Sequence, residues 1–150
     1  MLSMIQSNFS NAGNGPGNLE LVQNMGGTLY FFWRDDNAPF VWHGGPPNYS
    51  VVSGITGSPS LIQGRFGQRG HFELVVPLVT GGLVHYYRDN DTKDANGHLT
   101  LQWHRTAIFG QDKGVFDEVA LVHGKFGASA NYPGGAIPCF RSRCATRGGA

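Results

Sequence analysis

The feature that most constrains this chain is an internal repeat. The segment MIQSNF at 4–9 recurs as LIQGRF at 61–66 and again as LVHGKF at 121–126. The spacing is 57 residues between positions 4 and 61 and 60 residues between positions 61 and 121. A regular period of this length is typical of repeat proteins, in which each unit packs against the next one along the chain.

Further motifs recur between these marks, and their order is the same in both copies. GNLELV at 17–22 corresponds to GHFELV at 70–75, and GGTLYFFWRDD at 26–36 corresponds to GGLVHYYRDN at 81–90. Each copy then reaches the dipeptide WH. Several motifs in one order, found twice, indicate that the two copies share one architecture.

Each copy contains four short stretches of β-branched and aromatic residues, separated by turn-forming Gly, Asn and Asp. In the second copy the predicted strands are Leu61–Phe66, Phe72–Val79, Leu83–Arg88 and Leu99–Thr106. The glycine pairs at 26–27 and 81–82 stand where a hairpin turn requires positive φ. A repeat of about 50 residues with four strands has the size of one β-propeller blade.

We therefore predict an all-β fold of β-propeller blades, each a four-stranded antiparallel sheet. Within a repeat region at 1–126, blade 1 covers about 3–59, blade 2 covers about 60–118, and 119–126 begins a third. The segment 127–150 loses the alternation, so we expect an irregular tail: an open end, a cap or an altered reading of a longer gene. Because a propeller needs at least about four blades, we expect a ring completed by homo-oligomerisation or a fragment of a longer propeller.

The composition agrees with short strands and tight turns, since the chain has 23 glycines and only 14% charged residues. A formal net charge of +1 argues against a nucleic-acid partner. No apolar run is long enough for membrane insertion. The first ten residues lack the charged and apolar regions of a classical signal peptide, so the location is left open between the cytoplasm and an unconventional route of secretion.

The motifs SNF, GNLELV, GGLVHYYRDND and the closing WH resemble those of the PLL-type β-propeller lectins of bacteria, over residues 3 to about 126. Members of that family form seven-bladed propellers and bind fucose and related, often methylated, sugars between neighbouring blades without chemical turnover. The resemblance implies a non-catalytic carbohydrate-binding module whose partners are glycans. The alternative is a structural or protein-interaction propeller that serves as a scaffold and binds no sugar.

The candidate sugar-binding residues belong to the aromatic-Arg-Asp runs and the Trp-His pairs. Aromatic rings stack on the apolar face of a pyranose, and Arg, His and Asp exchange hydrogen bonds with hydroxyl groups. The predicted set is Trp33, Arg34, Asp35, Trp42, His43, Tyr87, Arg88, Asp89, Trp103 and His104. We rank Trp42 and Trp103 ahead of the arginines as ligand contacts. A structural alternative packs the aromatic rings between blades, uses Asp to hold the next turn and lays Arg across a neighbouring sheet.

The sequence predicts neither a metal site, nor a cofactor, nor an enzyme. The six histidines form no closely spaced set with carboxylates, and Cys139 and Cys144 are weak evidence for zinc or a disulfide. Glu20 and Glu73 occupy equivalent strand positions, whereas a glycosidase needs two carboxylates that converge on one bond. We expect these two side chains to point outward or to bond backbone groups.

Overall fold

The computed structural model of the 150-residue chain describes residues 1–10, 15–122 and 139–140. These residues form antiparallel strands and turns without an α-helix, and one 3-10 turn lies at Gln111–Lys113. The all-β prediction is therefore confirmed. None of the described segments is a helix long and apolar enough to cross a membrane.

The first sheet is an antiparallel meander in which β1 to β4 pair in chain order and β5 pairs with β3. Its strands are β1 (Leu2–Gln6), β2 (Leu19–Met25), β3 (Thr28–Arg34), β4 (Trp42–Gly44) and β5 (Ser50–Ser53). Both β4 and β5 pair with β3, so together they take the place of one predicted fourth strand. Pro46 and Pro47 lie between β4 and β5. Proline has no backbone N–H, so within a strand it would remove a ladder hydrogen bond.

The second sheet repeats this meander. Its strands are β6 (Ser60–Gln63), β7 (Phe72–Pro77), β8 (Leu83–Arg88) and β9 (Trp103–Phe109). Strand β9 begins later than the predicted Leu99 because Leu101 has a φ of 50°, which is incompatible with extended backbone. The paired glycines before β3 and β8 all have positive φ, between 62° and 91°, as predicted.

The repeat is reproduced in the strand register. In each sheet an arginine of the third strand lies between an apolar residue of the second strand and a tryptophan of the fourth. This triple is Leu19–Arg34–Trp42 in the first sheet and Phe72–Arg88–Trp103 in the second. Because side chains alternate along a strand, the register places each arginine and its tryptophan on the same face of their sheet.

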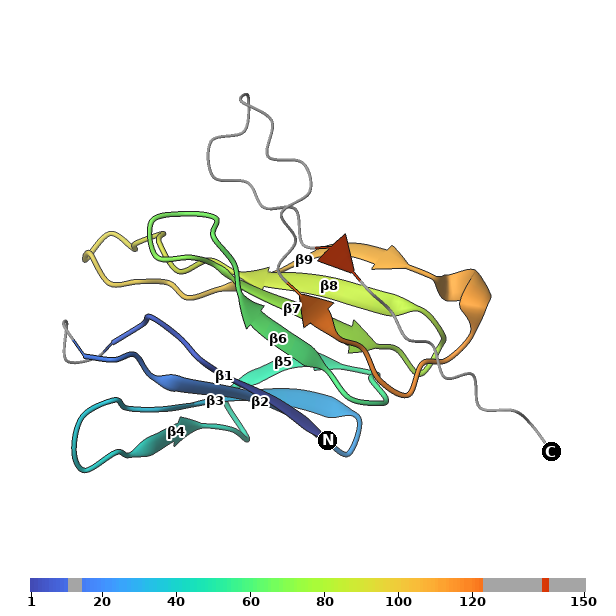
Figure 1. Ribbon diagram of the computed structural model, residues 1–150, viewed down its shortest axis with the longest axis horizontal. Coiled ribbons are helices and arrows are strands. Elements are labelled where there is room, and N and C mark those ends of the chain that lie inside the picture. Colours follow the sequence, from blue (N-terminus) through green and yellow to red (C-terminus); the bar gives the residue numbers. More distant parts are fainter. Residues whose placement is uncertain (11–14, 123–138, 141–150) are drawn as a thin grey trace, which may run out of the picture.

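The two sheets pack face to face as two layers (Figure 1). We call the face of a sheet that points toward the next unit along the chain its front face, and the opposite face its back face. Front-face residues of the first sheet and back-face residues of the second form one apolar core, together with Ile55 from the connection: Val22, Leu29, Phe31, Leu61, Phe72, Leu74, Val76 and Val84. At the edge of this interface the Leu61 N–H donates a hydrogen bond of 3.1 Å to Ser3 Oγ.

A third unit begins on the front face of the second sheet. Strand β10 (Leu121–Val122) pairs with β11 (Cys139–Phe140), and the Leu121 N–H donates a hydrogen bond of 2.9 Å to Ser60 Oγ. This contact repeats the one between Leu61 and Ser3, so β10 meets the second sheet at the position where β6 meets the first. The rest of the predicted tail, with Cys144, lies outside the described residues, and the propeller ring stays a prediction.

We expect Phe72→Ala to lower the free energy of unfolding by about 3 to 5 kcal/mol, because this fully buried ring fills the core between the sheets. Phe66→Ala is the matched control, since that ring is 41% exposed, and should change stability by less than about 1 kcal/mol. Urea denaturation followed by tryptophan fluorescence measures both. Equal losses in the two variants would contradict the packing described here.

Candidate ligand-binding site

A cavity of about 510 Å³ opens between the front face of the first sheet and the back face of the second. Its volume lies within the usual range for pockets that hold small molecules. Strands of both sheets line it, together with the loops that precede β2, β5 and β9: Phe9, Asn18, Glu20, Phe31, Trp33, Asn48, Tyr49, Ser50, Arg88, Leu99, Thr100, Leu101 and Trp103. The lining therefore combines aromatic rings with a few polar groups.

The aromatic part of the cavity centres on Trp33 and Trp103, which come from different sheets. Phe31 joins them, with ring centroids 6.1 Å from Trp33 and 5.8 Å from Trp103. Tyr49 meets Trp33 edge to face at 5.3 Å. These contacts fix the orientation of the rings before any ligand arrives, which lowers the entropy lost on binding.

Two further predicted residues, His43 and Asp35, hold Trp33 in place. The His43 ring stacks on Trp33 with centroids 5.1 Å apart. A hydrogen bond of 2.8 Å joins His43 Nε2 to Asp35 Oδ2 and fixes the imidazole in turn. Asp35 and His43 thus act on the cavity through the tryptophan and do not line it.

Arg88 is the cationic group of the cavity, although it is only 4% exposed. Its guanidinium lies 4.0 Å from the ring centroid of Phe72 and 4.8 Å from that of Phe31, and its Nε donates a hydrogen bond of 2.7 Å to Asn90 Oδ1. Burial lowers the pKa of Arg88 to about 10, while the negative charge of Glu20 opposes that shift. The guanidinium therefore stays charged at neutral pH.

Among the described residues that line the cavity, Glu20 is the only carboxylate, and it is 1% exposed. Its Oε1 accepts a hydrogen bond of 3.0 Å from Ser7 Oγ, while its buried Oε2 has no hydrogen-bond partner within the described part of the chain. Burial raises the pKa of Glu20 to about 7 against the opposing effects of Arg88 and Ser7. The expectation that this side chain points outward or bonds backbone groups is wrong, because strand alternation puts it on the buried face beside Val22.

The equivalent carboxylate of the second sheet has different neighbours. Glu73 Oε2 forms a hydrogen bond of 2.7 Å with His85 Nε2, and His85 Nδ1 forms one of 2.6 Å with Thr106 Oγ1. Beside them, the ring of Tyr87 stacks on that of His104 at 4.9 Å. This cluster lies on the front face of the second sheet, so Tyr87 and His104 are remote from the cavity.

Nine of the ten predicted site residues separate into four groups. Trp33, Arg88 and Trp103 line the cavity, and Asp35 and His43 support it. Tyr87 and His104 lie on the front face of the second sheet, and Arg34 and Trp42 lie on the back face of the first. Trp42, ranked first in the sequence analysis together with Trp103, is 48% exposed and does not line the cavity.

Asp89, the tenth residue, holds a turn. Its Oδ1 accepts hydrogen bonds from the N–H groups of Asp91 and Thr92, at 2.8 and 3.1 Å, and its Oδ2 accepts one of 2.5 Å from Thr92 Oγ1. The Thr92 hydroxyl and the Asp91 N–H lower the pKa of Asp89 to about 2. This is the turn-holding role that the structural alternative assigned to the aspartates of the motif.

Sequence reasoning missed several lining residues for two different reasons. Glu20 and Phe31 carried a usable signal, because each lies two positions from a buried apolar residue of its own strand and therefore on the same face. The lining residues at 48–50 and 99–101 carried none, because these loops differ between the copies and have no motif in common.

Comparison of the chain with protein-family models, with curated proteins and with solved structures found no match. Within the described segments, no group of three or more His, Cys, Asp or Glu side chains is placed to hold a metal ion. The interpretation of the cavity therefore depends on its own geometry and on the sequence repeat.

Glu20 should make stability fall as the pH rises. Its pKa is about 7 in the folded chain against 4.5 for the ordinary side chain, so between these values the folded state binds more protons than the unfolded state. This contribution is complete below pH 4.5 and is lost as the pH passes 7. Between pH 5 and 8 the free energy of unfolding should therefore decline, and we expect Glu20→Gln to remove roughly 2 to 3 kcal/mol of that decline. Denaturant unfolding at both pH values measures it, and an unchanged decline in the variant would contradict the burial of this carboxylate.

Proposed function

We propose that this protein is a carbohydrate-binding, lectin-like module and that the cavity between its sheets holds one sugar residue of a glycan. The observation that carries the proposal is the arrangement of Glu20 and Arg88 beside Trp33 and Trp103 in a single cavity. The cavity thus has an apolar part and a polar part. A sugar has the same two parts, since its ring has an apolar C–H face and an edge of hydroxyl groups.

The aromatic and polar parts of the lining match these two sides. Trp33, Tyr49 and Trp103 line the cavity and offer ring surface to the C–H face of a sugar. Glu20 Oε2 is buried without a partner, and such an acceptor carries a desolvation penalty of about 1 to 3 kcal/mol until a donor reaches it. A sugar hydroxyl is a donor of the right kind, and a neighbouring hydroxyl can accept from the fork of Arg88.

Fucose-type or methylated sugars are the preferred ligands in this proposal. A deoxy or O-methyl position replaces a hydroxyl group by apolar surface, which suits a cavity with several aromatic rings. The resemblance of the repeat motifs to the PLL-type lectins supports the same sugar class. No single group here would distinguish fucose from a methylated relative, so the binding assay includes both.

The proposed module is non-catalytic because hydrolysis of a glycoside requires two carboxyl groups on opposite sides of the scissile bond. The described lining of the cavity supplies one carboxylate, Glu20, and its counterpart Glu73 is engaged with His85 elsewhere. The other charged group among the described lining residues is the guanidinium of Arg88, which can bind a hydroxyl but cannot serve as a general acid at neutral pH. Binding without turnover fits this set of groups.

Trp103→Ala should weaken the binding of methyl fucoside or its O-methylated form at least tenfold, because the platform for the sugar ring is lost. Trp42→Ala is the matched control: this tryptophan occupies the equivalent register position in the first sheet but lies outside the cavity, so affinity should be unchanged. Isothermal titration calorimetry gives both values. A wild-type chain that binds neither sugar, or equal losses in the two variants, would rule the proposal out.

Affinity should also increase with pH. If the ionised form of Glu20 accepts the sugar hydroxyl, raising the pH from 6 to 8 releases the proton held at a pKa of about 7 and strengthens binding up to about tenfold. In Glu20→Gln this dependence should disappear. Titrations at the two pH values check it, and a pH dependence that survives in the variant would place the titrating group elsewhere.

A further inference from the structure

One side chain outside the cavity holds the guanidinium of Arg88 by a hydrogen bond. The Arg88 Nε donates a bond of 2.7 Å to Asn90 Oδ1, and Asn90 is fully buried. Asn90 is not among the described residues that line the cavity. Because Nε is engaged, the donors that remain for a ligand are the two terminal Nη groups of the guanidinium fork. Asn90 therefore acts on the cavity through Arg88.

Asn90 is itself fixed by two further hydrogen bonds. Its Nδ2 donates one of 2.7 Å to the carbonyl oxygen of Gly70, and its backbone N–H donates one of 3.2 Å to His71 Nδ1. The side-chain amide thus accepts from Arg88 through its oxygen and donates to Gly70 through its nitrogen. An ionised carboxylate has no donor and would leave the Gly70 carbonyl without this bond. The two neighbours together require a neutral amide at this position.

The first sheet lacks this arrangement, although it has the same motif. Arg34 occupies the register position of Arg88. Two residues further on, the first copy has Asp36 where the second has Asn90. The Gly17 N–H donates a hydrogen bond of 3.1 Å to Asp36 Oδ2. Within the described residues, Arg34 Nε is buried without a hydrogen-bond partner. The same strand position therefore holds its arginine by an amide in one copy only.

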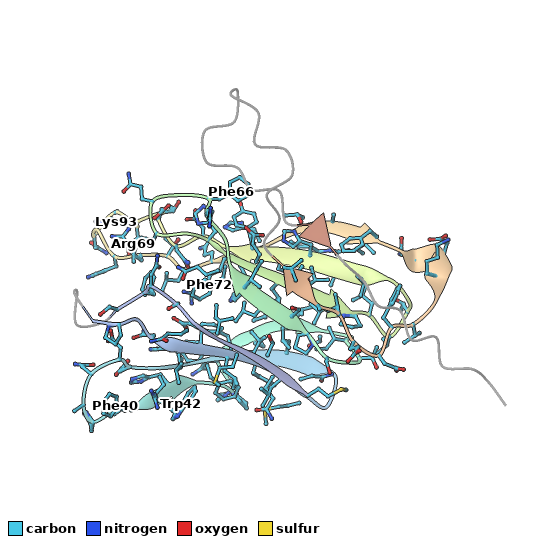
Figure 2. The ribbon with its side chains drawn as sticks, viewed as in Figure 1. Phe40, Trp42, Phe66, Arg69, Phe72 and Lys93 are labelled. Carbon is cyan, nitrogen blue, oxygen red and sulfur yellow. The ribbon has the colours of Figure 1, made fainter. Side chains whose placement is uncertain are left out.

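The two arginines also lie in different surroundings. Phe40 lies 5.4 Å from the Arg34 guanidinium, and Figure 2 shows Phe40 on the side of the first sheet that is turned away from the second. Phe72, whose ring centroid is 4.0 Å from the Arg88 guanidinium, lies between the two layers (Figure 2). The arginine that an amide holds is thus the one that lines the cavity.

We propose that Asn90 is a positioning residue of the cavity, which holds the Arg88 guanidinium at the cavity wall without neutralising its charge. A carboxylate in its place would pair with Arg88 and offset the positive charge that acts on Glu20. That charge lowers the pKa of Glu20 against the effect of burial, so the neutral amide keeps Glu20 ionised over more of the neutral pH range. This effect on Glu20 requires no ligand, whereas the effect of Asn90 on sugar affinity rests on the proposed function.

Asn90→Asp tests this role, and Asn37→Asp is the matched control. The first variant keeps an oxygen acceptor for Arg88 and adds a negative charge, so the pKa of Glu20 should rise from about 7 by about one pH unit or more. The control adds the same charge at an exposed asparagine away from the described lining, where solvent screens it, so that pKa should not change. ¹³C NMR of the glutamate carboxyl groups follows the titration, and Glu20→Gln identifies the signal.

Sugar affinity is the second readout. In the proposed function the ionised form of Glu20 accepts a sugar hydroxyl. Asn90→Asp should therefore weaken the binding of methyl fucoside at pH 7.5 by about threefold or more and move the midpoint of its pH dependence upward. Asn37→Asp should bind as wild type does. Calorimetric titrations at several pH values between 6 and 9 measure the affinity and the midpoint.

A Glu20 titration that is the same in wild type and in a folded Asn90→Asp variant would overturn the inference, because an asparagine with a purely structural role does not move it. If the variant does not fold, the Nε–H signal of Arg88 in the wild-type chain decides. Slow exchange of this proton with solvent supports the bond to Asn90, and exchange as fast as in exposed arginines contradicts it. A chain that binds no sugar but shows the expected change in Glu20 would sink the proposed function and leave this inference standing.

Discussion

The enclosure of Arg88 by aromatic rings of both sheets is the interaction on which the rest of the structure depends. Phe31 comes from the first sheet and Phe72 from the second, and the guanidinium lies within 4.8 Å of both ring centroids. A desolvated cation on aromatic faces contributes about 2 kcal/mol per favourable contact, and here it joins two layers that share one core. The same buried charge moderates the pKa of Glu20, so one residue links the packing of the sheets to the electrostatics of the cavity.

Repetition supplies the architecture, and small differences between the copies supply the site. Both sheets have a glutamate and an arginine at the same register positions, yet only Glu20 and Arg88 meet across an interface. Glu73 is instead paired with His85, where the first sheet has Phe31. The cavity therefore arises between two units, and neither sheet could form it alone. This explains why a motif present in both copies does not have the same role in both.

Most of the fold could be predicted from the sequence, because strand alternation and turn glycines are local signals. The interruption before β9 could not, since the left-handed conformation of Leu101 depends on its tertiary surroundings. Of the site, Trp33, Arg88 and Trp103 were predicted from the repeat, whereas Trp42 follows the same motif and lies outside the cavity. A motif defines a face of a sheet, but which faces are covered depends on the neighbouring units. The loops at 48–50 and 99–101 share no pattern, so their part in the lining was beyond sequence reasoning.

The three tryptophans of the chain offer the most direct test of the central claim, that a sugar binds between the two sheets. Each contributes one indole N–H signal to a ¹⁵N-correlated NMR spectrum, and single Trp→Phe variants assign them. If a sugar binds between the two sheets, titration with methyl fucoside or its O-methylated form should shift the signals of Trp33 and Trp103 with one common affinity and leave that of Trp42 in place. Shifts confined to Trp42, or no shift at saturating sugar, would contradict it.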